Sequence, residues 1–212
     1  DGCAGGNHRR TKSKVNISFT EDCLHINIWA PARVPKNGAP VVVYIHGGGF
    51  QSGTASDPIY DSRHYAEHGL IAVTFEYRLG PFGFMTAPGI PANLGIRDQQ
   101  LALRWVAKHI VSFGGDKDRV TVHGQSAGAM STLVHLVSPG SAGLFHAAII
   151  RSPVGLHYLT PEEALGHAKT MATVCKCNVT DLECLRKTSY KYLVDTELIP
   201  EYAEHLRTPG EG

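Results

Sequence analysis

A serine lies between two glycines in the segment Gly124–Gly128, which reads G-Q-S-A-G. Residues 119–123 before it have the pattern of a strand, and residues 127–137 after it have the pattern of a helix. A sharp strand-to-helix turn lifts a serine hydroxyl clear of a sheet, and flanking glycines leave room for the neighbouring backbone. The free N–H groups at the start of the helix favour negative charge there. We therefore predict that Ser126 is a nucleophile. The alternative is a glycine-rich turn with an incidental serine.

A second glycine-rich segment has the pattern of a site that stabilises negative charge. Residues 46–50 read H-G-G-G-F and follow the apolar run 41–45. Acyl transfer needs N–H donors placed where the carbonyl oxygen becomes negative, and losing one donor raises the barrier by about 3–4 kcal/mol. Three glycines let the backbone N–H groups turn to that point, as in HGGG-type loops. A flexible turn and a nucleotide loop are the alternatives. The nucleotide loop is excluded because neither G-x-G-x-x-G nor G-x-x-x-x-G-K-[ST] occurs here.

Two further clusters resemble metal sites only weakly. Residues 64–68 (H-Y-A-E-H) match the H-x-x-E-H zinc pattern, but Gly69 ends that helix at once and a chain with 12 histidines gives such matches by chance. Cys175 and Cys177 with His167 fit no common zinc spacing. We interpret residues 64–68 as a solvated helix face, and we predict that the chemistry needs neither a metal nor another cofactor.

The elements that would position these segments alternate between strands and helices. Short apolar runs predict strands that are buried on both faces, and 3.6-residue spacing predicts helices. Strands are expected at 24–29, 41–45, 70–75, 119–123 and 146–150, and helices at 98–110, 127–137 and 161–174. This alternation is typical of the α/β class, with a mostly parallel sheet that carries helices on both faces. Because no repeat or linker interrupts the pattern, we expect residues 1–212 to belong to one domain.

Composition and charge exclude several classes of protein. The chain has 212 residues, of which 42% are hydrophobic and only 18% are charged, with a formal net charge of +1. Scattered charges of both signs give no footprint for nucleic acid or for an anionic membrane. The apolar stretches are shorter than the roughly 18 residues that a membrane-spanning helix needs. A secretory signal is not recognisable at Asp1-Gly2-Cys3.

The five cysteines fall into two local groups, with Cys3 and Cys23 in the first group and Cys175, Cys177 and Cys184 in the second. Buried free thiols are one interpretation. Two short-loop disulfides with one thiol left over are preferred, because two glycosylation sequons accompany the cysteines. The sequons begin at Asn16 and Asn178. Cysteines and sequons together favour a secreted or extracellular glycoprotein.

With these motifs in place, the sequence resembles the type-B carboxylesterase and cholinesterase family. The resemblance runs nearly end to end and rests on several independent motifs in the family's order. Besides residues 46–50 and 124–128, these motifs are Glu21-Asp22-Cys23-Leu24 with Ile28-Trp29, Asn93–Gln99, Phe113–Asp116, Gly143–His146 and Cys184–Arg186. The resemblance implies an α/β-hydrolase fold for residues 1–212.

The resemblance also implies roles for single residues. Ser126 is the nucleophile, and the N–H groups of Gly48, Gly49 and Ala127 form the oxyanion hole. Arg78 and Asp98 resemble the family's buried ion pair behind the site. The implied disulfides are Cys3–Cys23 and Cys177–Cys184, although Cys175 could replace Cys177 as the partner of Cys184.

Some features depart from the family pattern. The family's order is Ser, then an acid, then His, but only 86 residues follow Ser126, and no Glu or His among them stands in the family's context. We therefore expect part of a longer chain, with a domain that is incomplete on its C-terminal side. Gln125 stands where cholinesterases carry Glu, and residues 4–22 contain no Trp for choline binding. Both differences disfavour a cholinesterase proper, and Gln125 resembles members similar to juvenile-hormone esterase.

The resulting hypothesis is a serine hydrolase of carboxylic esters of small, fairly apolar alcohols or acids, acting through an acyl-enzyme. The acid and the His would lie beyond residue 212, so the isolated chain is expected to be poorly soluble and nearly inactive. The alternative is a catalytically inactive adhesion or interaction protein on the same scaffold. The small-molecule partner of the hydrolase would be an ester. No nucleic acid or metal partner is expected, and the sequence predicts nothing about a membrane anchor.

Overall fold

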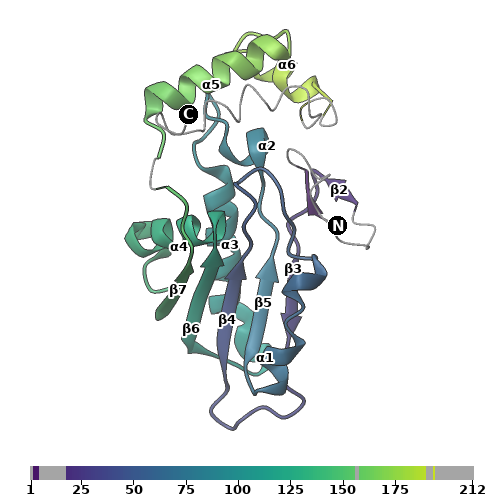
Figure 1. Cartoon of the computed structure of the whole chain (residues 1–212), viewed down its shortest axis with the longest axis vertical. Helices are drawn as coiled ribbons and strands as arrows, with labels where there is room; N and C mark the ends of the chain where they lie inside the picture. The colour runs from purple at the N-terminus through teal and green to yellow at the C-terminus, as the bar shows by residue number, and fades with distance from the viewer. Residues whose placement is uncertain (1, 5–17, 156–157, 190–192, 194–212) are drawn as a thin grey trace.

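A five-stranded sheet forms the centre of the computed structural model (Figure 1), which describes residues 2–4, 18–155, 158–189 and 193. The strand order is β3-β5-β4-β6-β7. Strands β5, β4, β6 and β7 run parallel, and β3 pairs with β5 in the antiparallel direction. The sheet is therefore mixed, with one antiparallel edge strand on a parallel core.

The elements have the following bounds. The strands are β1 (Gly2–Cys3), β2 (Phe19–Thr20), β3 (Ile26–Trp29), β4 (Ala39–Ile45), β5 (Ile71–Phe75), β6 (Gly115–Gln125) and β7 (Ala147–Arg151). The α-helices are α1 (Arg63–Glu67), α2 (Gly80–Phe84), α3 (Leu94–His109), α4 (Ala127–Val137), α5 (Pro161–Val174) and α6 (Leu182–Lys187). Short 3₁₀ helices are η2 (Pro58–Tyr60), η3 (Ile110–Phe113) and η4 (Pro139–Ser141).

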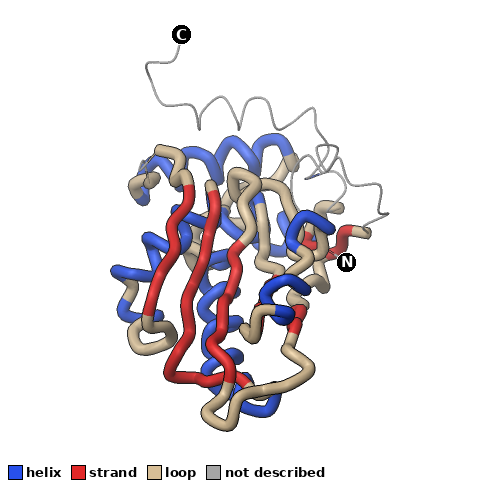
Figure 2. The backbone as a smooth tube through the Cα atoms, turned by 60° about the horizontal axis from the view of Figure 1, so that its bottom comes forward, coloured by secondary structure: helices blue, strands red, loops and turns tan. Residues whose placement is uncertain are grey.

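The core lies between the sheet and the two long helices α3 and α4, which pack behind the strands (Figure 2). Alternate residues of β4, β5 and β6 point to this side, because side chains along a strand alternate between its two faces. From the helical side, Leu103 and Val106 of α3 and the adjoining Ile110 are fully buried against them. Burying a Leu or Val side chain stabilises a fold by about 1.5–3 kcal/mol. This core therefore fixes the ends of β4 and β6, from which the glycine segments emerge.

The opposite face of the sheet is covered less evenly. Helix α1 packs on β5 and β3, and β5 is buried along its whole length. Strand β7 forms the other edge of the sheet, and its side chains alternate between exposed and half-buried. Ile149 on this strand is 45% exposed. Helices thus lie on both faces, but the face over β7 carries little cover within the described part of the chain.

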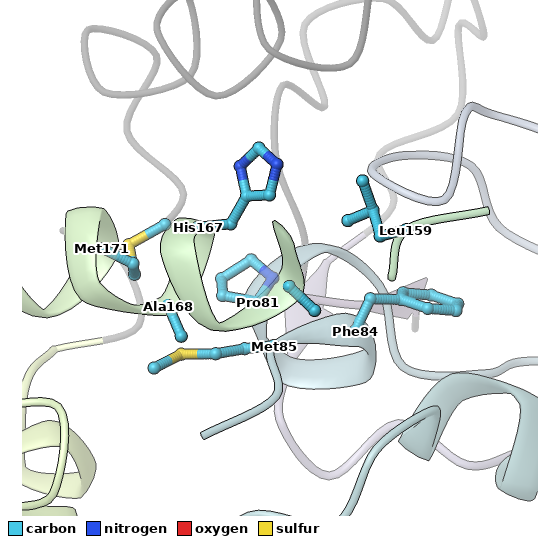
Figure 3. A pocket seen from close by; sticks show the side chains of 8 residues that line it. Pro81, Phe84, Met85, Leu159, His167, Ala168 and Met171 are labelled. Atoms are coloured by element: carbon cyan, nitrogen blue, oxygen red, sulfur yellow. The ribbon is translucent and has the colours of Figure 1, made fainter. Parts of the chain in front are cut away.

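The last described elements lie across one end of the sheet, where α5 and α6 stand above α2 (Figure 1). Helix α5 begins with a capping box, in which Thr160 and Glu163 satisfy each other's backbone N–H groups. Between α5 and α2 lies a small apolar pocket (Figure 3). Its lining residues are Pro81, Phe84, Met85, Leu159, Ala164, His167, Ala168 and Met171. Within the described ranges, no helix is both long and apolar enough to span a bilayer.

The structure confirms the expected α/β class and changes several boundaries. Helix α3 begins at Leu94 rather than at residue 98, and β6 extends over Gly115–Gln125 rather than over 119–123. The short helix α2 and the parallel pair β1–β2 were not predicted. His64 of α1 and His68, which directly follows this helix, are both exposed, as predicted for a solvated face.

Candidate active site

Ser126 occupies the turn between β6 and α4, in a backbone conformation that side chains rarely adopt. Its φ is 56° and its ψ is −122°. The surroundings hold this conformation, because the Ser126 N–H donates to the Arg151 carbonyl at 3.0 Å and the Ser126 carbonyl accepts from the Met130 N–H at 3.0 Å. Such strain persists only where neighbouring structure enforces it. The Ser126 side chain is half-buried.

The two glycines of the motif are required by close backbone contacts. A Cβ on Gly124 would lie 2.0 Å from the Gly128 carbonyl oxygen, and a Cβ on Gly128 would lie 2.1 Å from the Ile45 carbonyl oxygen. No side chain fits at these distances, which are well inside van der Waals contact. Strand β4 and the first turn of α4 therefore approach each other directly, and this approach sets the position of Ser126.

The glycine loop after β4 lies against the nucleophile. A Cβ on Gly47 would lie 3.2 Å from Ser126 Cβ and 2.8 Å from the Gln125 carbonyl oxygen. Gly48 has a φ of 123°, and a Cβ there would lie 2.0 Å from the Ser52 carbonyl oxygen. The Gly48 carbonyl accepts the N–H groups of Gln51 and Ser52, which closes the loop. The structure thus brings the two predicted segments together at one end of the sheet.

The three predicted oxyanion donors differ in their surroundings. Gly48 and Gly49 are exposed, whereas Ala127 is buried at the first position of α4. The first N–H groups of a helix have no partner within the helix and carry its positive dipole end. The N–H of Ala127 therefore lies at the start of α4, next to Ser126, in the kind of environment that a developing oxyanion requires.

A buried acid–histidine pair lies behind the glycine loop and was not predicted. His46 ends the run of β4, and Glu76 directly follows β5; their side chains are 1% and 2% exposed. Oε1 of Glu76 accepts hydrogen bonds from Thr54 Oγ1 at 2.5 Å and from the Ala55 N–H at 2.8 Å. The available sequence signal was a carboxylate placed immediately after the apolar run 70–75.

An ion pair fixes the segment that leads from β5 to α3. The Arg78 guanidinium donates to both Asp98 carboxylate oxygens at 2.7 Å, and the Arg78 backbone N–H adds a third bond at 3.1 Å. The Asp98 side chain is 5% exposed and that of Arg78 is 35% exposed. The pair, expected to be buried, is therefore buried on the acid side only. Hydrogen bonding to Asp98 raises the pKa of Arg78.

A buried polar network joins α4 to α3. His135 of α4 donates from Nε2 to Gln99 Oε1 at 2.9 Å, because an amide oxygen can only accept. His135 Nδ1 then accepts from the Ser141 hydroxyl at 2.9 Å. Gln99 also donates to Ser131 at 3.0 Å. Burial lowers the pKa of His135 to about 4, so this histidine is neutral and serves the packing of α4.

The structure contains two disulfides, Cys3–Cys23 and Cys177–Cys184, and Cys175 is a free, half-buried thiol. This pairing selects Cys177 over Cys175 as the partner of Cys184. Asn178 is exposed, and its side-chain oxygen accepts from the Thr180 hydroxyl at 2.8 Å. The other sequon asparagine, Asn16, lies outside the described residues.

The remaining clusters do not compete with this site. No group of three His, Cys, Asp or Glu side chains gathers as metal ligands in the part of the chain that the structure describes. Cys177 is held in a disulfide, which removes it from a ligand set with Cys175 and His167. The pocket between α2 and α5 (Figure 3) is lined by neither Ser126 nor the glycine loop.

A mostly parallel sheet with a strained serine between strand and helix, faced by a triglycine loop, defines an α/β hydrolase. The carboxylesterase family model matches residues 1–208, and the chain belongs to that family. A solved thermophilic pNB esterase shares the fold with a TM-score of 0.86 and 36% identity, over 97% of this chain and 42% of that one.

Curated relatives include several cholinesterases. Acetylcholinesterase 4 of Caenorhabditis briggsae is 45% identical over 84% of this chain, and the cholinesterase of Mus musculus is 40% identical over 86%. The acetylcholinesterase of Bungarus fasciatus is 42% identical over 86%. The chain spans 31–32% of the length of these relatives.

Proposed function

We propose that the complete protein hydrolyses carboxylic esters, with Ser126 as the nucleophile. The observation that carries the proposal is the contact between the two glycine segments, because Gly47 lies against the strained serine. The Ser126 oxygen attacks the ester carbonyl and the alcohol leaves. Water then releases the acid from the acyl-enzyme. This places the activity in the class of serine carboxylesterases, which need no metal or cofactor.

The N–H groups of Gly48, Gly49 and Ala127 form the oxyanion hole in this proposal. They come from two chain segments that the pairing of β4 with β6 brings together. Preset donors act strongly because they stabilise charge that develops only in the transition state.

The general base and its acid partner come from outside the described residues in this proposal. Within the described ranges, no histidine side chain is hydrogen-bonded to the Ser126 hydroxyl. The curated relatives are about three times as long as this chain, as their coverage of 31–32% indicates. We therefore expect the triad's acid and His beyond residue 212, in the order Ser, acid, His.

The favoured substrates are esters of small, fairly apolar alcohols or acids. Gln125, which directly precedes the nucleophile, is uncharged, and residues 4–22 contain no Trp for a cation–π contact with choline. Choline esters are the second candidate, because the relatives at 40–45% identity are named cholinesterases and acetylcholinesterases. The two candidates differ in the charge of the alcohol, so a pair of substrates with one acyl group separates them.

An oxidising, extracellular compartment is part of the proposal. Two disulfides with short loops support it, because such bonds persist where thiols are not kept reduced. Glycosylation at Asn16 and Asn178 would agree with this compartment, and Asn178 is exposed as a modified asparagine must be. The proposed partners are small-molecule esters.

The test is hydrolysis of an aryl butyrate and of butyrylthiocholine by the complete protein. We expect turnover of the aryl ester, and replacing Ser126 by Ala should lower kcat by on the order of 10⁶-fold. Ser112→Ala, the same change at an exposed serine, is the matched control. A folded protein that hydrolyses neither ester would contradict the proposal and favour a non-catalytic interaction role. Strong preference for the thiocholine ester would select the second candidate.

A further inference from the structure

His46 and Glu76 bury two polar atoms that face each other. His46 Nε2 lies 3.8 Å from Glu76 Oε2, and neither atom has a hydrogen-bond partner in the described part of the chain. The two residues are neighbours because β4 and β5 are parallel and in register, with Tyr44 opposite Thr74. An unpaired buried polar atom is costly, so this arrangement requires an explanation.

The hydrogen bonds around the pair decide where protons can be. Glu76 Oε1 is occupied by the two donors Thr54 and Ala55. His46 Nδ1 lies 2.8 Å from the Gly47 carbonyl oxygen, which can only accept, so Nδ1 carries a proton. In a neutral imidazole Nε2 is then a bare acceptor. Without a further proton, two acceptors would face each other in a dry site.

We propose that one proton, shared between Glu76 and His46, holds the oxyanion loop in place, so that both are positioning residues. With Glu76 as a neutral acid, its Oε2–H donates to His46 Nε2. An O–H···N bond of about 2.8 Å needs a closing movement of about 1 Å. His46 in turn donates from Nδ1 to the Gly47 carbonyl. The chain of donors thus runs from Glu76 through the imidazole to the loop.

The hydrogen bond from His46 orients the Gly48 N–H because the peptide between Gly47 and Gly48 is planar. The Gly47 carbonyl and the Gly48 N–H belong to one rigid unit, so anchoring the carbonyl orients the N–H, which is a proposed oxyanion donor. Gly53 seals this contact, because a Cβ there would lie 2.5 Å from the Gly47 carbonyl oxygen and 2.7 Å from His46 Nδ1. Gly53 thus closes one side of this bond to water.

Few other groups act on the pair. The Tyr77 ring is stacked on His46 with centroids 4.4 Å apart, and its hydroxyl donates to the His46 carbonyl at 2.8 Å. Burial raises the pKa of Tyr77, so it stays neutral. From the loop after β4, the uncharged Thr54 and Ala55 face Glu76, and the backbone N–H of Cys3 in β1 lowers the Glu76 pKa without bonding to Oε2. His46 is the one titratable side chain among the described residues that opposes Glu76 at close range.

The electrostatics agree with this arrangement. Burial raises the pKa of Glu76 to about 7, although hydrogen bonds from Thr54 and Ala55 lower it. Burial lowers the pKa of His46 to about 4, against the hydrogen bond to Gly47, which raises it. Below pH 7 the pair thus keeps one acidic proton, on the carboxyl group. Above pH 7 that proton leaves to solvent, the remaining imidazole proton is drawn to Nε2 beside the carboxylate, and the Gly47 carbonyl loses its donor.

The inference rests on the proposed esterase function and adds a pH dependence to it. The test compares kcat for aryl butyrate hydrolysis by the complete protein from pH 6 to 9, in wild type and in Glu76→Gln. The Gln amide can accept from Thr54 and Ala55 and donate to His46, but it does not titrate. We expect wild-type kcat to fall on the order of tenfold relative to the variant between pH 6 and 9, with KM nearly unchanged. Glu162→Gln, at an exposed position of α5, should follow wild type. Parallel profiles of wild type and Glu76→Gln would overturn the inference.

Histidine ring ¹⁵N NMR of the complete protein provides a test that needs no turnover. Signals of His46, assigned by their loss in His46→Gln, should show a proton on Nδ1 at pH 6 and on Nε2 at pH 9. An Nδ1–H that persists at pH 9 would overturn the inference, including when Glu76→Gln fails to fold. If the protein hydrolyses no ester, the proposed function fails and these spectra still decide whether the proton is shared.

Discussion

Gly47 lies directly against Ser126, so that a Cβ on the glycine would be 3.2 Å from the serine Cβ. The contact joins the end of β4 to the turn between β6 and α4, two segments that are adjacent because β4 and β6 pair in parallel. The glycine loop and the nucleophile therefore form one unit, and a small displacement of either changes the distance between the reacting carbonyl and its donors.

Replacing Gly47 by Ala tests this contact. The added methyl group would lie 2.8 Å from the Gln125 carbonyl oxygen, so the loop must move away from the nucleophile. We expect kcat for ester hydrolysis to fall on the order of 10²-fold, as when one oxyanion donor is lost, with a smaller change in KM. Gly166→Ala in α5 is the control, because a Cβ there meets nothing within 4 Å. Unchanged kcat in Gly47→Ala would show that the loop does not take part in catalysis.

Replacing Asp98 by Ala should destabilise the fold. The change removes three hydrogen bonds from Arg78 and leaves its guanidinium beside an apolar methyl group. Breaking a fully buried pair costs about 3–5 kcal/mol. Since the Arg78 side chain is 35% exposed and regains water, we expect about 2 kcal/mol. Thermal unfolding measures the effect. Asp118→Ala, which breaks the exposed pair with Lys117, should leave Tm unchanged. Equal Tm values for the two variants would contradict the assigned role of Asp98.

His135 predicts an acid-sensitive stability. Its pKa is about 4 in the fold, below the ordinary value of 6.5, so the unfolded chain binds more protons than the folded chain between these values. The stabilisation from neutral His135 is therefore complete above pH 6.5 and is lost as pH falls toward 4, by roughly 3 kcal/mol. Glu76, whose pKa is raised to about 7, stabilises the fold more as pH falls, but it is present in both wild type and His135→Gln. Tm should drop less between pH 7 and 4.5 in His135→Gln than in wild type. Identical drops in Tm would refute this role.

The predicted elements agree with the structure where the local sequence pattern matches the environment of those residues in the fold. Helix α4 has the predicted bounds because the turn at Ser126 starts it and Pro139 follows soon after its end at Val137. Helix α3 begins four residues earlier than the sequence predicts, at Leu94 rather than at Asp98. In the structure Asp98 lies in the fifth position and pairs with Arg78, and Asn93, with a φ of 58°, precedes the first turn.

Other features depend on contacts that are distant in sequence. Helix α2 contains two glycines and a proline in five residues, a composition with poor helix propensity, and it forms by packing on α3. Residues 117–119 of β6 are polar and exposed and lie where the pairing with β4 shifts register, so this part of the strand lacks a strand pattern. The contact between His46 and Glu76 also has no local sequence pattern. The two residues are 30 positions apart and meet only through the register of β4 and β5.

The candidate site likewise contains residues that the sequence predicts and residues that only the fold reveals. Ser126 and the glycine loop were predicted because their chemistry requires fixed residue types at short spacing, as the HGGG and G-x-S-x-G patterns express. The residues that hold the loop have no such pattern. Their role follows from burial and from hydrogen-bond partners, which only the fold defines.

Covalent labelling tests the central claim, that Ser126 is the nucleophile. A fluorophosphonate probe bonds to an activated serine oxygen with loss of fluoride, and peptide mapping by mass spectrometry locates the adduct in the complete protein. We predict one adduct on the peptide that contains Ser126, no adduct in Ser126→Ala, and wild-type labelling in Ser112→Ala. Labelling of a different serine, or ester turnover that continues without any adduct at Ser126, would contradict the account.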